Sequence, residues 1–187
     1  QIDRKTKQKT LIKFNDAAYS AYLTNNYDYK SKSFNFAYSS LKTPTIIYSQ
    51  NLYTKKRKKV WQQNILNHKE KDYEIKRLFI KARDGIKVPI SLVFKKGINL
   101  KKAPLLQYGY GSYGLIIEPS FKLSFMPLID QGFVFAIAHI RGGQDLGQDW
   151  YDQGRMLKKM NTFTDFIDCT KELISKKIGN DKKTFAM

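Results

Sequence analysis

The first third of the chain alternates between hydrophobic and polar positions, as half-buried β-strands do. Residues 33–38 (Ser-Phe-Asn-Phe-Ala-Tyr) alternate strictly, so successive side chains point to opposite faces. Two further β-prone runs, at residues 45–49 and 59–64, follow polar turns. This regular spacing between about residues 14 and 72 predicts a sandwich, or one to two blades of a β-propeller.

The pattern changes after the charged segment at residues 68–74. Strand-like runs at residues 76–83 and 86–94 flank Asp84-Gly85, a dipeptide typical of tight hairpin turns. Three apolar runs come later, and we expect each to form a strand of one sheet; they are residues 105–108, 133–140 and 183–187. The second is almost uninterrupted, which is typical of a parallel strand covered on both faces.

Helical patterns separate these later strands. We expect one helix over Phe121–Gln131, ended by Gly132. A second helix follows Thr162, which together with Asp165 predicts a variant of the capping box. Antiparallel strands followed by β-α-β-α-β predict an α/β domain that is cut off midway.

The net charge of +18 raises a second possibility, a basic module that binds nucleic acid or an anionic surface. The charge is uneven: residues 1–100 carry +15 and residues 101–187 only +3. It is densest at Lys55–Lys59, between two predicted strands, where a solvated turn is the alternative explanation.

Cysteine content and the absence of long apolar runs suggest a compartment for the protein. Cys169 is the only cysteine, which excludes an internal disulfide and favours a reducing, cytoplasmic setting. Its place in a helical pattern favours a buried hydrophobe over a reactive thiol. We see no secretory signal at Gln1 and expect no membrane span.

A glycine-rich loop, Gly109-Tyr-Gly-Ser-Tyr-Gly114, follows the first apolar strand and matches G-x-G-x-x-G. A dinucleotide fingerprint would open a helix directly and place Asp130 at the end of a strand. Neither condition fits the pattern, so we expect no cofactor. Ser112 lacks the G-x-S-x-G setting of a nucleophile elbow. It reads as a loop residue.

Few other residues suggest chemistry. His68 and His139 are the only histidines. Neither has a cluster with metal-ligand spacing, so we expect no metal and no complete Ser-His-Asp triad. Arg141-Gly-Gly143 follows an apolar strand, where α/β proteins bind ligands. Arg141 either contacts substrate there or pairs with a nearby aspartate, and the sequence leaves both alternatives open.

Taken together, the motifs resemble the prolyl oligopeptidase family of serine peptidases, in its oligopeptidase B (protease II) branch. The resemblance covers the chain from about residue 14 and rests on residues 39–45, 82–93, 106–114, 133–143, 147–154 and 157–168. It implies the N-terminal half of an α/β-hydrolase domain at residues 73–187, truncated before the catalytic serine. Residues 1–72 would be the incomplete last part of a β-propeller. Gln144 departs from the pattern, where the family continues its glycine run.

The resemblance also implies roles for two residues. Tyr110 matches the tyrosine whose hydroxyl helps to form the oxyanion hole. Tyr113 matches a substrate-pocket aromatic. Arg141 is a further candidate for substrate binding because of its place in the loop after the apolar strand. The family cleaves short peptides, in this branch after Lys or Arg, and its Gly-Gly-Ser-x-Gly-Gly elbow would follow Met187. We therefore expect the chain alone to be inactive, with short basic peptides and the missing C-terminal half of the domain as its partners.

Overall fold

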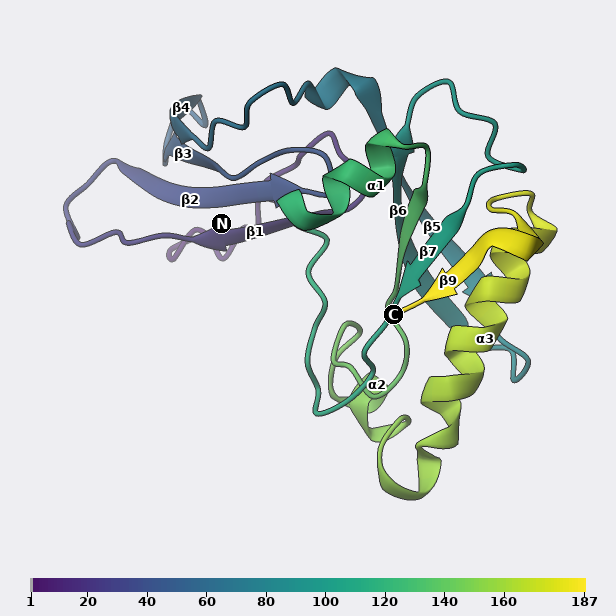
Figure 1. Cartoon of the computed structure of the whole chain (residues 1–187). Coiled ribbons are helices and arrows are strands. Elements are labelled where there is room, and N and C mark those ends of the chain that lie inside the picture. The colour runs from purple at the N-terminus through teal and green to yellow at the C-terminus, as the bar shows by residue number, and fades with distance from the viewer. Residues whose placement is uncertain (1) are drawn as a thin grey trace.

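The computed structural model describes residues 2–187, which form two β-sheets joined by a short connection (Figure 1). The first sheet has four antiparallel strands in chain order: β1 (Tyr19–Leu23), β2 (Ser33–Ser40), β3 (Ile46–Asn51) and β4 (Arg57–Gln62). The predicted strands of the first third are thus confirmed. A sheet of four sequential antiparallel strands has the architecture of one propeller blade.

The second sheet is mixed and has the order β5-β6-β8-β7-β9. Its strands are β5 (Tyr73–Lys81), β6 (Lys87–Lys95), β7 (Leu105–Tyr108), β8 (Val134–Ala138) and β9 (Thr184–Ala186). β5 and β6 form the predicted hairpin, and β7 lies parallel to both β8 and β9. β7 lies between β8 and β9 in the sheet. Because these three strands are parallel, the chain crosses over between β7 and β8 and again between β8 and β9.

Three α-helices and four 3₁₀ turns complete the structure. The α-helices are α1 (Met126–Asp130), α2 (Gln148–Asp152) and α3 (Met160–Ser175). The 3₁₀ turns are η1 (Glu70–Asp72), η2 (Leu123–Phe125), η3 (Met156–Lys158) and η4 (Asp181–Lys183). None of the helices in residues 2–187 has the length and apolar character to cross a bilayer.

α1 and α3 cover opposite faces of the second sheet. Along β8, Phe135 and Ile137 pack with α1, whereas Val134 and Ala136 face the cluster that contains Cys169 of α3. This strict alternation places a buried layer on each face of the strand, which explains its nearly uninterrupted apolar sequence. Cys169 has no exposed surface, as expected of a buried hydrophobe.

Two helix predictions need correction. The helix expected over Phe121–Gln131 is shorter: α1 begins at Met126. Pro127 lies in its first turn, where the missing N–H costs nothing. The capping box expected at Thr162 is wrong, because α3 begins at Met160 and Thr162 lies inside it.

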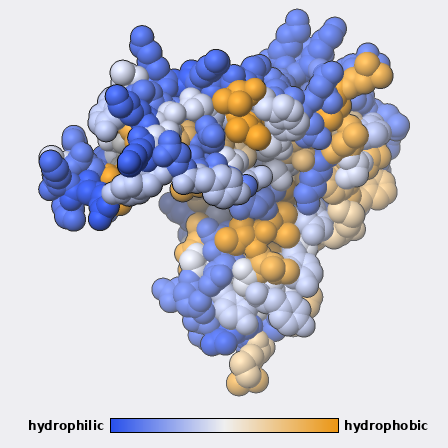
Figure 2. Space-filling model, turned by 90° about the vertical axis from the view of Figure 1, so that its left-hand side faces the viewer, coloured by the Kyte–Doolittle hydropathy of each residue, from blue (hydrophilic) through white to orange (hydrophobic). Residues whose placement is uncertain are grey.

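One residue of the basic run at Lys55–Lys59 also packs against aromatic side chains. The Arg57 guanidinium lies over three aromatic rings of the first sheet, 4.6 Å from the ring centre of Phe14 and slightly farther from Phe36 and Tyr48. Figure 2 shows hydrophilic residues over much of one side of the molecule, with hydrophobic residues in separate patches. Arg57 thus packs against aromatic rings, yet it stays exposed, as do the other residues of Lys55–Lys59.

Candidate active site

The loop Gly109–Gly114 leaves the carboxyl end of β7 beside the end of β9. The Gly109 N–H donates to the Met187 carbonyl at 3.2 Å, and the Met187 N–H donates to Gln107 at 2.9 Å. Both predicted tyrosines are accessible: Tyr110 is 43% exposed and Tyr113 82%. The loop thus presents two aromatic side chains at the edge of the sheet where β9 ends.

Three glycines from separate segments pack backbone to backbone: Gly111 of this loop, Gly142 and Gly154. A Cβ on Gly142 would overlap the carbonyl oxygen of Gly111, and one on Gly154 would overlap the backbone of Gly142. Gly111 has φ +60°, and a Cβ there would overlap the methyl group of Thr162. The Thr162 hydroxyl donates to the Arg141 carbonyl at 2.7 Å. Only glycine allows these three segments to approach so closely.

Lys159, immediately before α3, contacts the same loop. Its Nζ lies 2.5 Å from the carbonyl oxygen of Gly111 and 2.6 Å from the hydroxyl of Ser112. Burial lowers the pKa of the Lys159 amine. Lys159, Thr162 and Asp165 are spaced by three residues and lie on one face of the helix, from which all three hold loops of the site.

Arg141 follows β8 and is buried between two carboxylates. Its guanidinium donates to both oxygens of Asp165, at 2.8 and 2.6 Å, and pairs with Asp84 at 2.7 Å. Arg141 is only 2% exposed and Asp165 is fully buried. These hydrogen bonds raise the pKa of Arg141 and keep it charged. The structure therefore shows the aspartate pairing, the second of the two alternatives, and a contact of Arg141 with substrate stays a prediction.

Ser91, His139 and Asp145 are hydrogen-bonded in series, with the histidine between the serine and the aspartate, as in a Ser-His-Asp triad. His139 Nδ1 lies 2.7 Å from Asp145, and Nε2 lies 2.8 Å from the hydroxyl of Ser91. Arg77 also contacts Nε2, at 2.7 Å. Because a guanidinium can only donate, Nε2 accepts and the ring proton lies on Nδ1.

These three residues cannot act as a catalytic triad. Ser91 has no exposed surface, so a substrate carbonyl cannot reach its hydroxyl. The hydrogen bond from Arg77 occupies the lone pair that a general base would need. His139 is thus a hydrogen-bonded structural residue, and its partners come from β5, β6 and the loop after β8.

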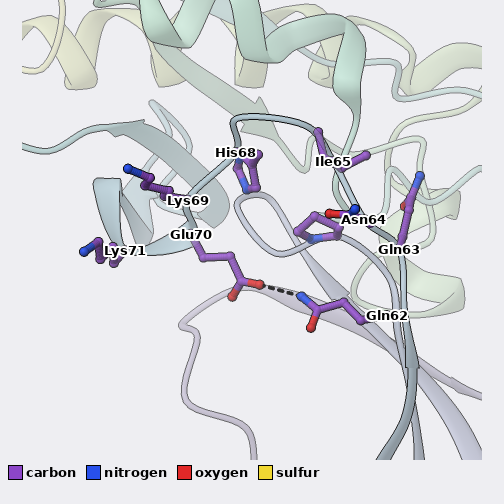
Figure 3. A pocket seen from close by; sticks show the side chains of 9 residues that line it. Gln62, Gln63, Asn64, Ile65, His68, Lys69, Glu70 and Lys71 are labelled. Carbon is purple, nitrogen blue, oxygen red and sulfur yellow. Dashed lines mark hydrogen bonds between the residues drawn. The ribbon is translucent and has the colours of Figure 1, made fainter.

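A separate hollow of about 500 Å³ lies where the first sheet joins the second. It is lined by residues after β4 and around η1, including Gln62, His68 and Glu70 (Figure 3). Glu70 accepts hydrogen bonds from Gln62 at 3.0 Å and from Thr43 at 3.0 Å. His68 Nε2 contacts the Lys42 carbonyl at 2.7 Å. The hollow offers hydrogen-bonded junction residues and no activated nucleophile.

The structure also tests whether Gly109–Gly114 and Asp130 have the arrangement of a dinucleotide-binding site. Gly109–Gly114 does not open a helix, since the first helical turn after it is η2. Asp130 ends α1, accepts a hydrogen bond from Tyr73 and lies 3.2 Å from Lys95, so it is not placed as a ribose ligand. Within residues 2–187, no three His, Cys, Asp or Glu side chains are grouped to hold a metal ion.

Sequence reasoning missed Lys159, Asp165 and the Arg77–Ser91–His139 cluster. The three-residue spacing of Lys159, Thr162 and Asp165 could have indicated one polar helix face. Nothing local signals that this face meets Gly111 and Arg141. Ser91 and His139 are likewise 48 positions apart in sequence and meet only because β6 pairs with β8.

Comparison with known proteins agrees with this architecture. The profile of the prolyl oligopeptidase family matches residues 119–187. The chain is 39% identical over 94% of its length to dipeptidyl aminopeptidase BI from Pseudoxanthomonas mexicana and 33% identical to protease 2 from Moraxella lacunata. It covers 25% and 26% of their lengths, respectively.

A solved structure shares the fold. Oligopeptidase B from Trypanosoma brucei, with covalently bound antipain, superposes with a TM-score of 0.84 at 38% identity. The superposition covers 93% of this chain and 25% of that one. Both sheets, and not only the profile-matched segment, are therefore shared with that enzyme. The chain is therefore similar to the prolyl oligopeptidase family, by its profile over residues 119–187 and by its fold over both sheets.

Proposed function

We propose that this chain supplies the oxyanion loop and half of the central sheet of a serine oligopeptidase that cleaves short peptides after Lys or Arg. In this proposal residues 1–72 are the last part of a β-propeller and residues 73–187 the first part of an α/β-hydrolase domain. The cleavage preference comes from the oligopeptidase B relatives. Short basic peptides would be the substrates of the complete enzyme.

The observation that carries the proposal is the position of Tyr110. β7 is the third strand of its sheet in chain order, and the loop after the third strand supplies oxyanion donors in α/β-hydrolases. The hydrogen bond from Gly109 to Met187 places this loop beside the carboxyl end of β9. A strand-to-helix turn after β9 would hold a nucleophilic serine next to the Tyr110 hydroxyl.

Mechanistically, a phenol fixed at this position would donate a hydrogen bond to the oxyanion of the tetrahedral intermediate. The donor acts without reorganising, because the loop is already held by the hydrogen bond from Lys159 to the Gly111 carbonyl. Residues 2–187 contain no accessible Ser–His pair within hydrogen-bond distance: the only such pair that the structure shows is Ser91 with His139, which is buried. The chain alone would therefore not hydrolyse peptides.

The test compares the chain alone with the chain co-expressed with the C-terminal quarter of the Pseudoxanthomonas mexicana relative. We expect a Lys- or Arg-linked fluorogenic peptide to be cleaved only by the combined protein. Tyr110→Phe removes only the hydroxyl and should lower kcat by about 10²–10³. Tyr53→Phe, at a residue 75% exposed in the turn between β3 and β4, is the control and should have no effect.

Two results would contradict the proposal. The first is turnover by the 187 residues alone that a serine-directed inhibitor abolishes. The second is a combined protein that cleaves the peptide with the same kcat after Tyr110→Phe.

A further inference from the structure

Ser112 and Lys159 form a close pair of a hydroxyl and an amine that the peptidase function does not require. Their Oγ and Nζ atoms lie 2.6 Å apart. Ser112 is partly exposed, and both residues line a hollow of about 260 Å³. Tyr151 and Met156 lie in its wall. A small molecule entering this hollow would therefore reach the Ser112 hydroxyl.

Lys159 has no carboxylate partner within ion-pair distance in residues 2–187, unlike its neighbour Arg155, which lies 2.8 Å from Asp152. Its hydrogen-bond partners are neutral, the Gly111 carbonyl and the Ser112 hydroxyl, and its Nζ also lies 5.8 Å from the ring centre of Phe163. Burial without a counter-charge favours the neutral amine, in line with the lowered pKa. A neutral amine can donate one N–H to Gly111 and turn its lone pair toward the Ser112 hydroxyl.

The backbone after Ser112 adds a hydrogen-bond donor. Tyr113 has φ +55°, in the left-handed region that non-glycine residues seldom adopt. The backbone N–H groups of Ser112 and Tyr113 have no acceptor in the described part of the chain. In serine nucleophile sites the N–H of the residue after the serine stabilises the oxyanion, and Tyr113 holds that position here.

We propose that Ser112 and Lys159 are a nucleophile and general base that accept an acyl group from small activated esters. Lys159 Nζ takes the hydroxyl proton as Ser112 Oγ attacks the ester carbonyl. The Oγ–C bond forms, the bond from the carbonyl carbon to the aryloxide breaks, and the aryloxide leaves with the electron pair. The products are acyl-Ser112, the aryloxide and the Lys159 ammonium ion.

This reactivity is separate from peptide hydrolysis. An aryloxide leaves unprotonated, so this step needs no proton back from the Lys159 ammonium ion, whereas a peptide amine must be protonated as it leaves. A lysine likewise acts as the general base toward a serine in Ser–Lys variants of serine enzymes. The inference does not depend on the proposed peptidase function, since it needs no residue beyond this chain.

The experiment treats the 187-residue chain with p-nitrophenyl acetate and locates the acetyl group by peptide mass spectrometry. We expect acetylation of Ser112, abolished by Ser112→Ala. Lys159→Arg keeps a cation that can donate to Gly111 but cannot act as a base, and it should slow Ser112 acetylation by at least about 100-fold. Lys158→Met, at an exposed neighbour, is the matched control and should leave the rate unchanged.

A measurement on the unmodified chain covers the case in which a variant does not fold. The rate of Ser112 acetylation should rise with pH through one ionisation below the ordinary lysine pKa, as Lys159 loses its proton. Acetylation at Lys159 in place of Ser112, a pH-independent rate, or equal rates in the folded Lys159→Arg and Lys158→Met variants would each overturn the proposal.

Discussion

Removing the Asp165 carboxylate should destabilise the protein more than any change on the exposed face of α3. Asp165 is fully buried and holds Arg141 through two hydrogen bonds, at 2.8 and 2.6 Å. It also accepts from the Arg141 backbone N–H at 3.1 Å. Asp165→Ala would leave a buried guanidinium with only Asp84 as its partner and a backbone donor with no acceptor.

The magnitude follows from these contacts. Breaking a buried ion pair by removing one partner costs about 3–5 kcal/mol. Because Asp84 still pairs with Arg141, we take the lower end, about 3 kcal/mol. With a urea dependence of about 2 kcal/mol per molar, the unfolding midpoint should fall by about 1.5 M. The free energy of unfolding of a single domain is about 5–15 kcal/mol, so the loss is a large fraction of the stability.

The assay is urea unfolding followed by tryptophan fluorescence; Trp61 is already 51% exposed, whereas Trp150 is 6% exposed, donates to the His139 carbonyl at 3.0 Å and changes its surroundings on unfolding. Asp168→Ala is the matched control, three residues later on the same helix. Asp168 also pairs with an arginine, Arg83, but that side chain is 53% exposed, so solvent replaces much of the interaction. Equal midpoints for the two variants would refute the argument from burial.

Three further outcomes can be measured on the same chain. Gly111→Ala should lower the unfolding midpoint more than Gly97→Ala, because both have positive φ but only Gly111 has no room for a Cβ; equal losses would assign the cost to backbone strain alone. Cys169, whose thiol pKa burial raises, should react with a disulfide reagent only as the protein unfolds, and immediate reaction in native buffer would contradict this. Burial and its hydrogen bond to Asp130 raise the pKa of Tyr73 to about 12 from 10.0; the neutral phenol therefore contributes stability below pH 10.0 that is lost as pH rises through about 12. Tyr73→Phe should flatten that part of the curve of unfolding free energy against pH, and an unchanged curve would exclude the contribution.

Local patterns account for most of the secondary structure. The alternation at residues 33–38, the Asp84-Gly85 turn and the apolar run at residues 133–140 each fix a conformation through neighbours a few positions away. The predicted strands at these places are confirmed. The resemblance to the prolyl oligopeptidase family is confirmed for the same reason, since its motifs are contiguous stretches of sequence. The predicted roles of Tyr110, Tyr113 and Arg141 remain predictions.

The capping-box error has a tertiary cause. Thr162 and Asp165 have the spacing of a capping box, which is a local pattern, yet their hydroxyl and carboxylate are used by Arg141, more than twenty residues away. Once these groups bind another loop, they are not available to cap the helix that carries them. The helix accordingly begins earlier, at Met160.

The sequence by itself determined most of the strands, because they depend on short-range periodicity and turn chemistry, and its contiguous motifs carried the family resemblance. The tertiary structure alone decided which polar side chains meet. It buried Arg141 between two aspartates, closed Ser91 off behind Arg77 and His139, and brought Lys159 to Ser112. Such contacts join positions that are dozens of residues apart, and they form only when sheet pairing and helix packing bring separate loops to one place.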